Sequence, residues 1–306
     1  MAVLNPPRVL PGLGRAIINF LIENRSAWDE AGLVDAFKPG GVNDSGGAAD
    51  GVKNTLSAFR AIGMLHTSPQ GGITAAESVT MHGSMFGRDD FRRVMLKHVL
   101  DLDRDGDPWA VGDGEASTSG ARDLTRALSW FLAQDALSAP LSWNDNIQKM
   151  QADQFGTSEN LRWPIANDTR WNAFARWAPA LGLAVPSVVR GAAGLVPLPT
   201  LAITDIIAQM PDGQMQIEDF LNALARKLPV LSRGVVRNAL VARLAVDPDP
   251  GVHNNSVDTS VAQVLRILEA RGRLSLETLA DAGGLFLSPS SHSRTTHVTL
   301  KGGKKR

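Results

Sequence analysis

The chain has 306 residues, of which 43% are hydrophobic and 20% are charged, so it can bury roughly two or three modest cores. It contains no cysteine, which excludes disulfides and cysteine-ligated metal sites, and it has no apolar run of about 18 residues for a membrane span. Lysine plus arginine equals aspartate plus glutamate, at 31 each, so any nucleic-acid binding must be local. A cytoplasmic location without membrane contact is expected.

The first expected unit covers residues 11–77 and begins with two short helices. Ile17 and Leu21 recur at helical spacing, and Ser26 with Asp29 has the order of a capping box at the start of the second helix. A third helix and a short β-hairpin complete this unit. Helices followed by a hairpin are typical of the winged helix-turn-helix build, which binds nucleic acid or a protein partner and seldom performs chemistry.

The helix, the glycine after it and the two following strands form a pattern that recurs. The three occurrences are Val52–Ala76, Arg170–Pro199 and Val261–Leu287. Each helix ends at a glycine that can adopt a left-handed conformation, and these are Gly63, Gly182 and Gly272. The sequence therefore predicts a mainly α fold with short β-hairpins, organised as tandem winged helix-turn-helix units.

The remaining boundaries follow from the same pattern. Residues 78–119 hold a basic helix and an acidic linker, residues 120–199 form a second winged-helix-like unit, and residues 201–300 form a third. A proline-broken loop between Asp247 and Ser256 indicates one additional helix in this third unit. The last residues, 301–306, form a basic tail that either lies on phosphates or is solvated.

The candidate DNA-binding side chains are the outward polar and basic residues of the hairpin helices and of the hairpins. They are Lys53, Asn54, Arg60, Arg170, Asn172, Arg176, Arg190, Arg266 and Arg294. The first hairpin turn carries no cation and is the weakest DNA contact. The same faces could instead hold protein partners, because a winged-helix shape alone does not imply groove binding.

Two motifs resemble a metal site and an enzyme site, but neither is complete. Asp101, Asp103 and Asp105 open like a calcium loop, but the twelfth position, which needs a glutamate, is Gly112. The NDSGG segment that ends at Gly47 resembles the surroundings of a serine protease nucleophile, without the context that such a motif requires. We expect no catalytic residues, no metal and no cofactor, and a nuclease or hydrolase is the weakest of the functional hypotheses.

Several segments together resemble the DpdG family. They are LNPPRVLPGLGRAIINFLIE, GVKNTLSAFRAIGML, SGARDLTRALSWFLAQD and NDTRWNAFARWAPALGLA. This family is encoded in bacterial gene clusters that insert 7-deazaguanine derivatives into DNA and restrict DNA lacking them. The resemblance implies a non-enzymatic role beside helicase, ATPase and phospholipase-D-like nuclease components. The two leading hypotheses are a DNA-binding component of this defence system and a protein scaffold without nucleic-acid contact.

Overall fold

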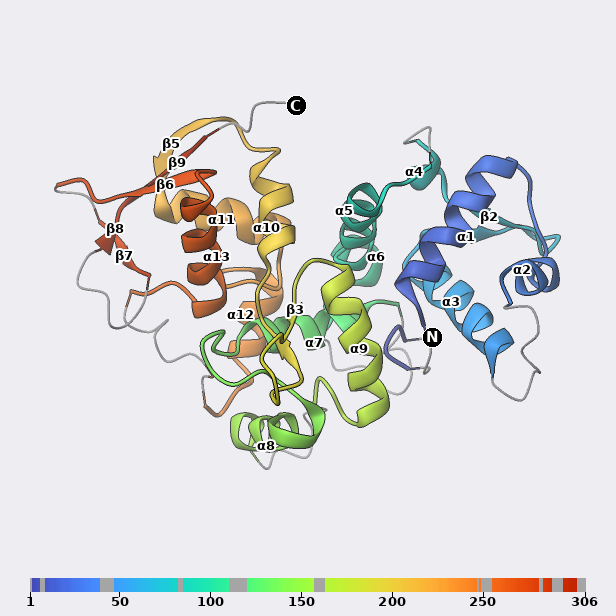
Figure 1. Cartoon of the computed structure of the whole chain (residues 1–306), viewed down its shortest axis with the longest axis horizontal. Helices are drawn as coiled ribbons and strands as arrows, with labels where there is room; N and C mark the ends of the chain where they lie inside the picture. Colours follow the sequence, from blue (N-terminus) through green and yellow to red (C-terminus); the bar gives the residue numbers. More distant parts are fainter. Residues whose placement is uncertain are drawn as a thin grey trace. The chain divides into compact units, whose positions relative to one another are not determined.

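The computed structural model describes residues 2–5, 9–38, 47–81, 85–109, 120–156, 163–246, 248, 255–280, 283–287 and 294–301. The chain is mainly helical with short antiparallel strand pairs, which confirms this part of the expected fold class (Figure 1). Its contacts group it into two compact units, one of residues 1–125 with 165–181 and one of residues 126–164 with 182–306. The three-unit division expected from the sequence stays a prediction.

The first unit begins with three helices and a hairpin. These elements are α1 (Pro11–Asn24), α2 (Glu30–Phe37), α3 (Ala48–Ala61), β1 (Leu65–Thr67) and β2 (Ile73–Ala75). Strand β1 pairs antiparallel with β2, and Trp28, which precedes α2, pairs with Ile73 on the other edge of β2. The apolar stripes of the helices meet in a core that includes Ile17, Leu33 and Phe59.

The expected capping box at the start of α2 was wrong by one turn. Asp29 is the N-cap, and its carboxylate accepts a hydrogen bond from the Gly32 amide at 2.6 Å. The Ser26 hydroxyl instead accepts a hydrogen bond from the indole of Trp28 at 3.1 Å. The reason is a contact between distant parts of the chain, because the pairing of Trp28 with Ile73 of β2 keeps the chain extended until Asp29.

The described part of the first unit continues with further helices. They are α4 (Glu77–Thr80), α5 (Arg88–Val99), α6 (Leu102–Asp105) and α9 (Asp168–Ala180). Helix α5 confirms the basic helix expected there. Helix α9 packs against α1 and α3, and the ring of Trp177 lies 5.8 Å from that of Phe59. The carboxylate of Asp123 accepts hydrogen bonds from the Val3 and Leu4 amides at 3.1 and 2.8 Å, which fixes the first residues to this unit.

The end of α3 is held by a small polar cluster. Gly63 has a φ of +72°, the left-handed conformation expected for it. The Ile62 carbonyl accepts hydrogen bonds from the Arg104 guanidinium and from Nδ1 of His98, the latter at 3.0 Å. Because a carbonyl oxygen can only accept, Nδ1 of His98 carries a proton in this contact.

Acidification should weaken the fold through His98. Its pKa is lowered from the ordinary value of 6.5, mainly because burial disfavours the charged ring and further because Arg104 is near, while the bond to Ile62 raises it. The folded state therefore binds this proton more weakly than the unfolded chain, so stability is full above about pH 6.5 and falls below it. Thermal unfolding at about pH 7.5 and 5.5 measures this loss, and His98→Gln should reduce it. Equal losses in both proteins would contradict this account.

The second unit begins at the junction in α7 (Arg122–Leu132) and holds the rest of the chain. Its further helices are η3 (Trp143–Ile147), α8 (Gln148–Phe155), α10 (Thr200–Ile207), α11 (Ile217–Lys227), α12 (Val235–Val241) and α13 (Thr259–Ala270). A buried network joins α7 to α8, because Nε1 of Trp130 donates to Oε1 of Gln154 at 2.7 Å and Gln154 donates to Gln134 at 2.8 Å. Helix α12 confirms the additional helix expected in the third segment.

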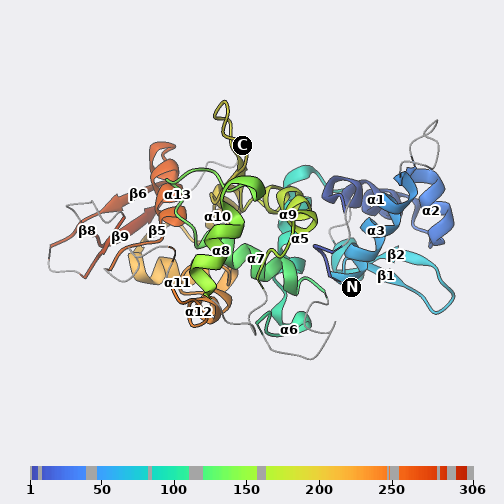
Figure 2. The same cartoon turned by 90° about the horizontal axis from the view of Figure 1, so that it is seen from below.

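The strands of the second unit correct one sequence expectation. They are β3 (Val185–Pro186), β4 (Leu195–Val196), β5 (Gly213–Gln216), β6 (Leu274–Glu277), β7 (Leu285–Phe286), β8 (Arg294–Thr295) and β9 (His297–Leu300). The expected hairpin of β6 with β7 was wrong, because β6 pairs with β9 in a three-stranded antiparallel sheet of order β5-β9-β6 (Figure 2). The alternation of buried side chains along β9 explains why β6 pairs with it, since buried Val298 and Leu300 lie opposite Leu276 and Leu274.

Within the described part of the chain, one strand arrangement occurs three times. In each occurrence, an extended residue or strand that follows a first helix pairs antiparallel with the last strand of the hairpin. The pairs are Trp28 with Ile73, Leu141 with Leu195, and β5 with β9. Gly182 and Gly272 have φ values of +75° and +66°, so the left-handed helix ends expected from the sequence are confirmed.

Candidate nucleic-acid interface

Helix α3 presents a polar face whose cations differ in their surroundings. Lys53 is exposed, whereas Asn54 and Arg60 are half-buried. The guanidinium of Arg60 lies 2.8 Å from the carboxylate of Glu30 on α2, so its charge is already compensated within the unit. Lys53 is therefore the cation of α3 that is better placed to meet a phosphate.

Helix α9 carries a stripe of exposed polar side chains. Asn172 and Arg176 are both exposed and lie four residues apart, so they point from the same side of the helix, while Arg170 is half-buried. The opposite side buries Trp171, Phe174 and Trp177. Among the described residues, Arg176 has no ion-pair partner, and α9 lies in the same compact unit as α3. An arginine and an amide on one helical face can bind phosphates and base edges.

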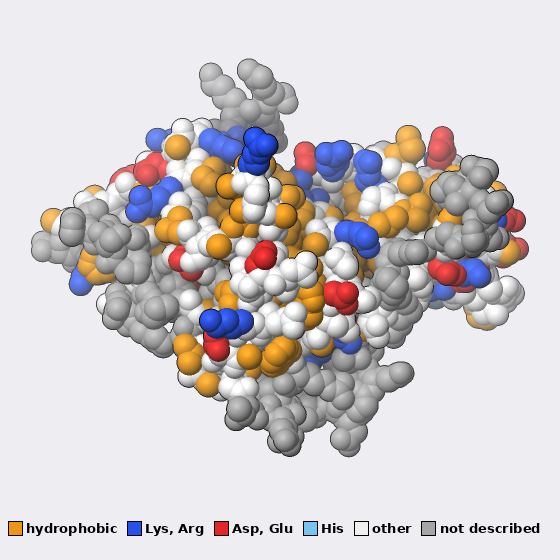
Figure 3. Space-filling view, turned by 60° about the horizontal axis from the view of Figure 1, so that its bottom comes forward, with side chains coloured by type: hydrophobic (Ala, Val, Ile, Leu, Met, Phe, Trp, Pro, Cys, Tyr) orange, Lys and Arg blue, Asp and Glu red, His pale blue; other side chains and the backbone are white. Residues whose placement is uncertain are grey.

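The other three candidate arginines belong to the second unit. Arg190 is exposed in the turn between β3 and β4, and Arg266 is exposed on α13. The Arg294 guanidinium lies over the ring of Phe286, 5.1 Å from its centroid, which holds it on the β7–β8 ribbon. Figure 3 shows one face of the molecule, on which lysines and arginines form separate groups among apolar and uncharged side chains.

The first turn of α13 is covered. Its buried residues there are Thr259, Ser260, Val261 and Ala262. The Ser260 hydroxyl donates to the Leu132 carbonyl at 3.0 Å, and the Thr259 hydroxyl accepts from the Ala136 amide at 3.0 Å. This end of α13 is used for packing within the second unit, which leaves Arg266 in the middle of the helix as its exposed cation.

The acidic residues after α5 have structural partners. The Asp101 side chain accepts from the Arg104 amide and caps α6, and the Asp105 carboxylate binds the Arg104 guanidinium and the Ala121 amide. No group of three potential metal-ligating side chains occurs among the described residues. Of the protease-like NDSGG segment, only Gly47 lies within the described residues, and of the basic tail only Lys301 does.

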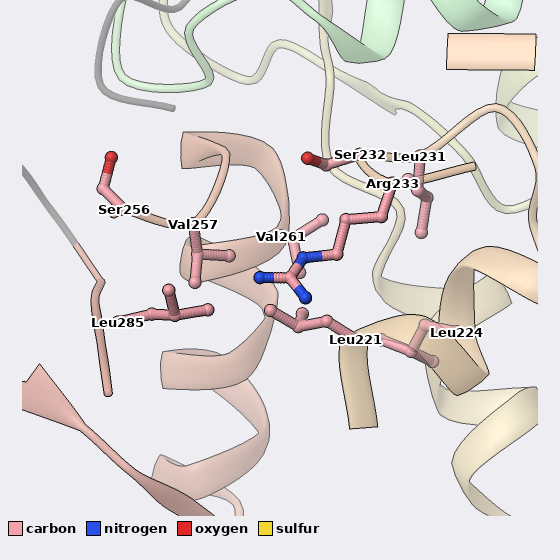
Figure 4. A pocket seen from close by; sticks show the side chains of 9 residues that line it. All are labelled: Leu221, Leu224, Leu231, Ser232, Arg233, Ser256, Val257, Val261 and Leu285. Carbon is pink, nitrogen blue, oxygen red and sulfur yellow. The ribbon is translucent and has the colours of Figure 1, made fainter. Parts of the chain in front are cut away.

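Each unit contains a hollow that is lined by described residues. In the second unit, a cavity of about 20 Å³ has an apolar wall that includes Leu221, Val261 and Leu285, and Arg233 lies across it (Figure 4). It has room for about one water molecule. In the first unit, an open cleft of about 360 Å³ is lined by residues of α1, β2 and α4 and by Arg25. Neither combines an enclosed volume with converging ionisable groups, as a small-molecule site usually does.

One exposed feature of the second unit was not predicted from the sequence. Val188 and Val189 precede Arg190 in the β3–β4 turn, and both side chains are exposed. The signal was present in the sequence, because two adjacent β-branched apolar residues are unusual in a hairpin turn.

The protein is mainly helical, and helices with exposed polar faces precede its hairpins in the chain. Comparison with known proteins identifies its family. A model of the DpdG-like family matches residues 1–282, so the chain belongs to this family. This membership links it to the dpd system of 7-deazaguanine modification and to a gene cluster with other proteins. Comparisons with the curated proteins and with the solved structures gave no match. None of the described helices is both long enough and apolar enough to cross a membrane.

Proposed function

We propose that this protein is a non-catalytic, cytoplasmic DNA-binding component of the 7-deazaguanine-dependent restriction system, built from tandem winged-helix units. Strand order supports the winged-helix part of the proposal. In that fold a strand after the first helix pairs with the last strand of the hairpin, as β5 pairs with β9 and Trp28 with Ile73. The first pattern lies within the second compact unit and the other within the first.

The observation that carries DNA binding is the exposed stripe of Asn172 and Arg176 on α9. This helix immediately precedes a hairpin, and in a winged-helix domain the helix before the hairpin enters the major groove. Its arginine has no ion-pair partner among the described residues. Lys53 on α3 of the same unit supplies a second exposed cation for phosphate contact.

Replacing Asn172 and Arg176 together by alanine should weaken binding to a duplex of about 20 base pairs roughly tenfold or more. One lost phosphate contact also makes the slope of log affinity against log salt shallower by about 0.9. Fluorescence anisotropy between about 50 and 200 mM salt measures both effects. Duplexes with and without 7-deazaguanine derivatives report whether the modification is sensed.

Lys97→Ala is the matched control, because Lys97 is an exposed cation on α5 of the same unit and outside the stripe. Arg60→Ala should have a smaller effect than the double variant, since Glu30 already compensates that charge. Circular dichroism checks that helicity is retained. If the wild-type protein binds no duplex at low salt, the proposal that it binds DNA is wrong.

A scaffold without nucleic-acid contact is the second candidate function. The covered first turn of α13 favours it, because a recognition helix normally uses that end to reach the groove. The partners would be the helicase, ATPase and phospholipase-D-like nuclease components that the family resemblance implies. The stripe variant would then bind such a partner less tightly while DNA binding stays absent.

A further inference from the structure

The turn between β3 and β4 exposes apolar surface in an unusual way. Val188 is 95% exposed and Val189 is 64% exposed, and Val188 is the most exposed large apolar side chain among the described residues. In Figure 2 the yellow segment around this turn projects from the second unit. Turns normally hold glycine, asparagine, aspartate or serine, so two valines here indicate contact with something outside the chain.

The ribbon tip, defined as Ser187–Gly194, is ordered by its own hydrogen bonds. The Ser187 amide donates to the Gly194 carbonyl at 2.9 Å, and the Ala192 amide donates to the Val189 carbonyl at 3.1 Å. Arg190 and Gly191 are the central residues of this turn, and the φ of Gly191 is +81°, as the third position of a type II turn requires. The valines and Arg190 are therefore presented on a preorganised support.

The charge of the ribbon tip is positive and isolated. Arg190 is the only charged residue between Arg176 and Asp205 in the sequence, so no nearby carboxylate along the chain opposes it. It is exposed and has no ion-pair partner among the described residues. The β1–β2 turn differs in this respect, because its residues from Ser68 to Gly72 include no cation.

We propose that the ribbon tip enters the minor groove of duplex DNA, with Arg190 facing the negative potential of the groove and the two valines packing against its sugar walls. This proposal rests on the proposed DNA-binding function and assigns one of its contacts to a groove. The minor groove is about 6 Å wide, so it admits a turn and excludes a helix. A narrow groove attracts arginine, and apolar side chains are the usual accompanying contact in minor-groove binding.

Salt separates the two components of this contact. The double variant Val188→Ser with Val189→Ser should bind an A·T-rich duplex about tenfold more weakly than the wild type. This factor should be the same at every salt concentration, because apolar burial releases no counterions. Arg190→Gln should make the salt slope shallower by about 0.9. Netropsin, a minor-groove ligand, should compete with the wild-type protein for the duplex. Val235→Ser is the matched control, because Val235 is 63% exposed on α12 of the same unit.

The outcomes distinguish this inference from the function on which it rests. If the α9 stripe variant loses DNA affinity while the valine and Arg190 variants bind as the wild type does, the ribbon tip does not contact DNA and a protein contact takes its place. Netropsin without effect on wild-type binding would also overturn the minor-groove assignment. If the wild-type protein binds no duplex at about 50 mM salt, the proposed function fails together with this inference.

Discussion

Replacing Asp258 with alanine should lower the free energy of unfolding by about 3–5 kcal/mol. Asp258 precedes α13, and its carboxylate lies 3.8 Å from the guanidinium of Arg237 on α12, with exposed side-chain fractions of 2% and 3%. Removing the carboxylate leaves the buried guanidinium of Arg237 without its counterion. Urea unfolding at neutral pH measures the change in free energy.

The paired replacement is the control for this prediction. Arg237→Met combined with Asp258→Leu removes both charges, and such a change is often neutral or stabilising, so most of the loss should be recovered. The recovery is incomplete to the extent that Arg237 also donates to the Ser129 carbonyl at 3.4 Å. If Asp258→Ala is as stable as the wild type, the buried ion pair does not stabilise the fold.

Trp177→Ala should destabilise the first unit by about 3–5 kcal/mol. Trp177 on α9 is completely buried, and its ring contacts that of Phe59 on α3. Removal of the indole leaves a large cavity that the two packed helices cannot close. Thermal or urea unfolding provides the measurement, and Phe59→Ala with the double variant completes a mutant cycle for the contact.

Trp177→Phe separates ring packing from the polar group. The indole nitrogen of Trp177 is buried without a hydrogen-bond partner among the described residues, so its removal has no bond to break. The phenylalanine variant should therefore lose much less stability than the alanine variant. A coupling energy near zero between positions 59 and 177 would show that α9 is not part of the core of the first unit.

Local patterns predicted most of the helices. The apolar spacing around Ile17 and Leu21 indicated α1, and Gly63, Gly182 and Gly272 marked the ends of α3, α9 and α13. These signals are local, because helical periodicity and a left-handed glycine depend on a few neighbouring residues.

Pairings between distant residues could not be predicted in the same way. The partner of β6 is β9, which follows a second ribbon, and the short strand β5 carries a glycine and two glutamines with little β-forming tendency. The Ser26 and Asp29 pattern was misleading, because a single pairing between Trp28 and Ile73 decides where α2 begins.

The residues of the candidate site could likewise be predicted only where local patterns decide their position. Periodicity was sufficient to place Asn172 and Arg176 on one outward face, but the pairing of Arg60 with Glu30 joins two helices and needs the folded structure. The grouping of α9 with α3 also joins segments that are far apart in the chain. DNA binding by these residues stays a prediction.

The first unit is discontinuous, since residues 126–164 separate its helix α9 from the rest of it. During synthesis, the apolar surface around Phe59 therefore remains without Trp177 until α9 has left the ribosome. A fragment that stops at residue 125 would leave this surface uncovered and be prone to aggregate. Truncations for binding experiments are consequently better made beyond Leu181, or avoided by using the full chain.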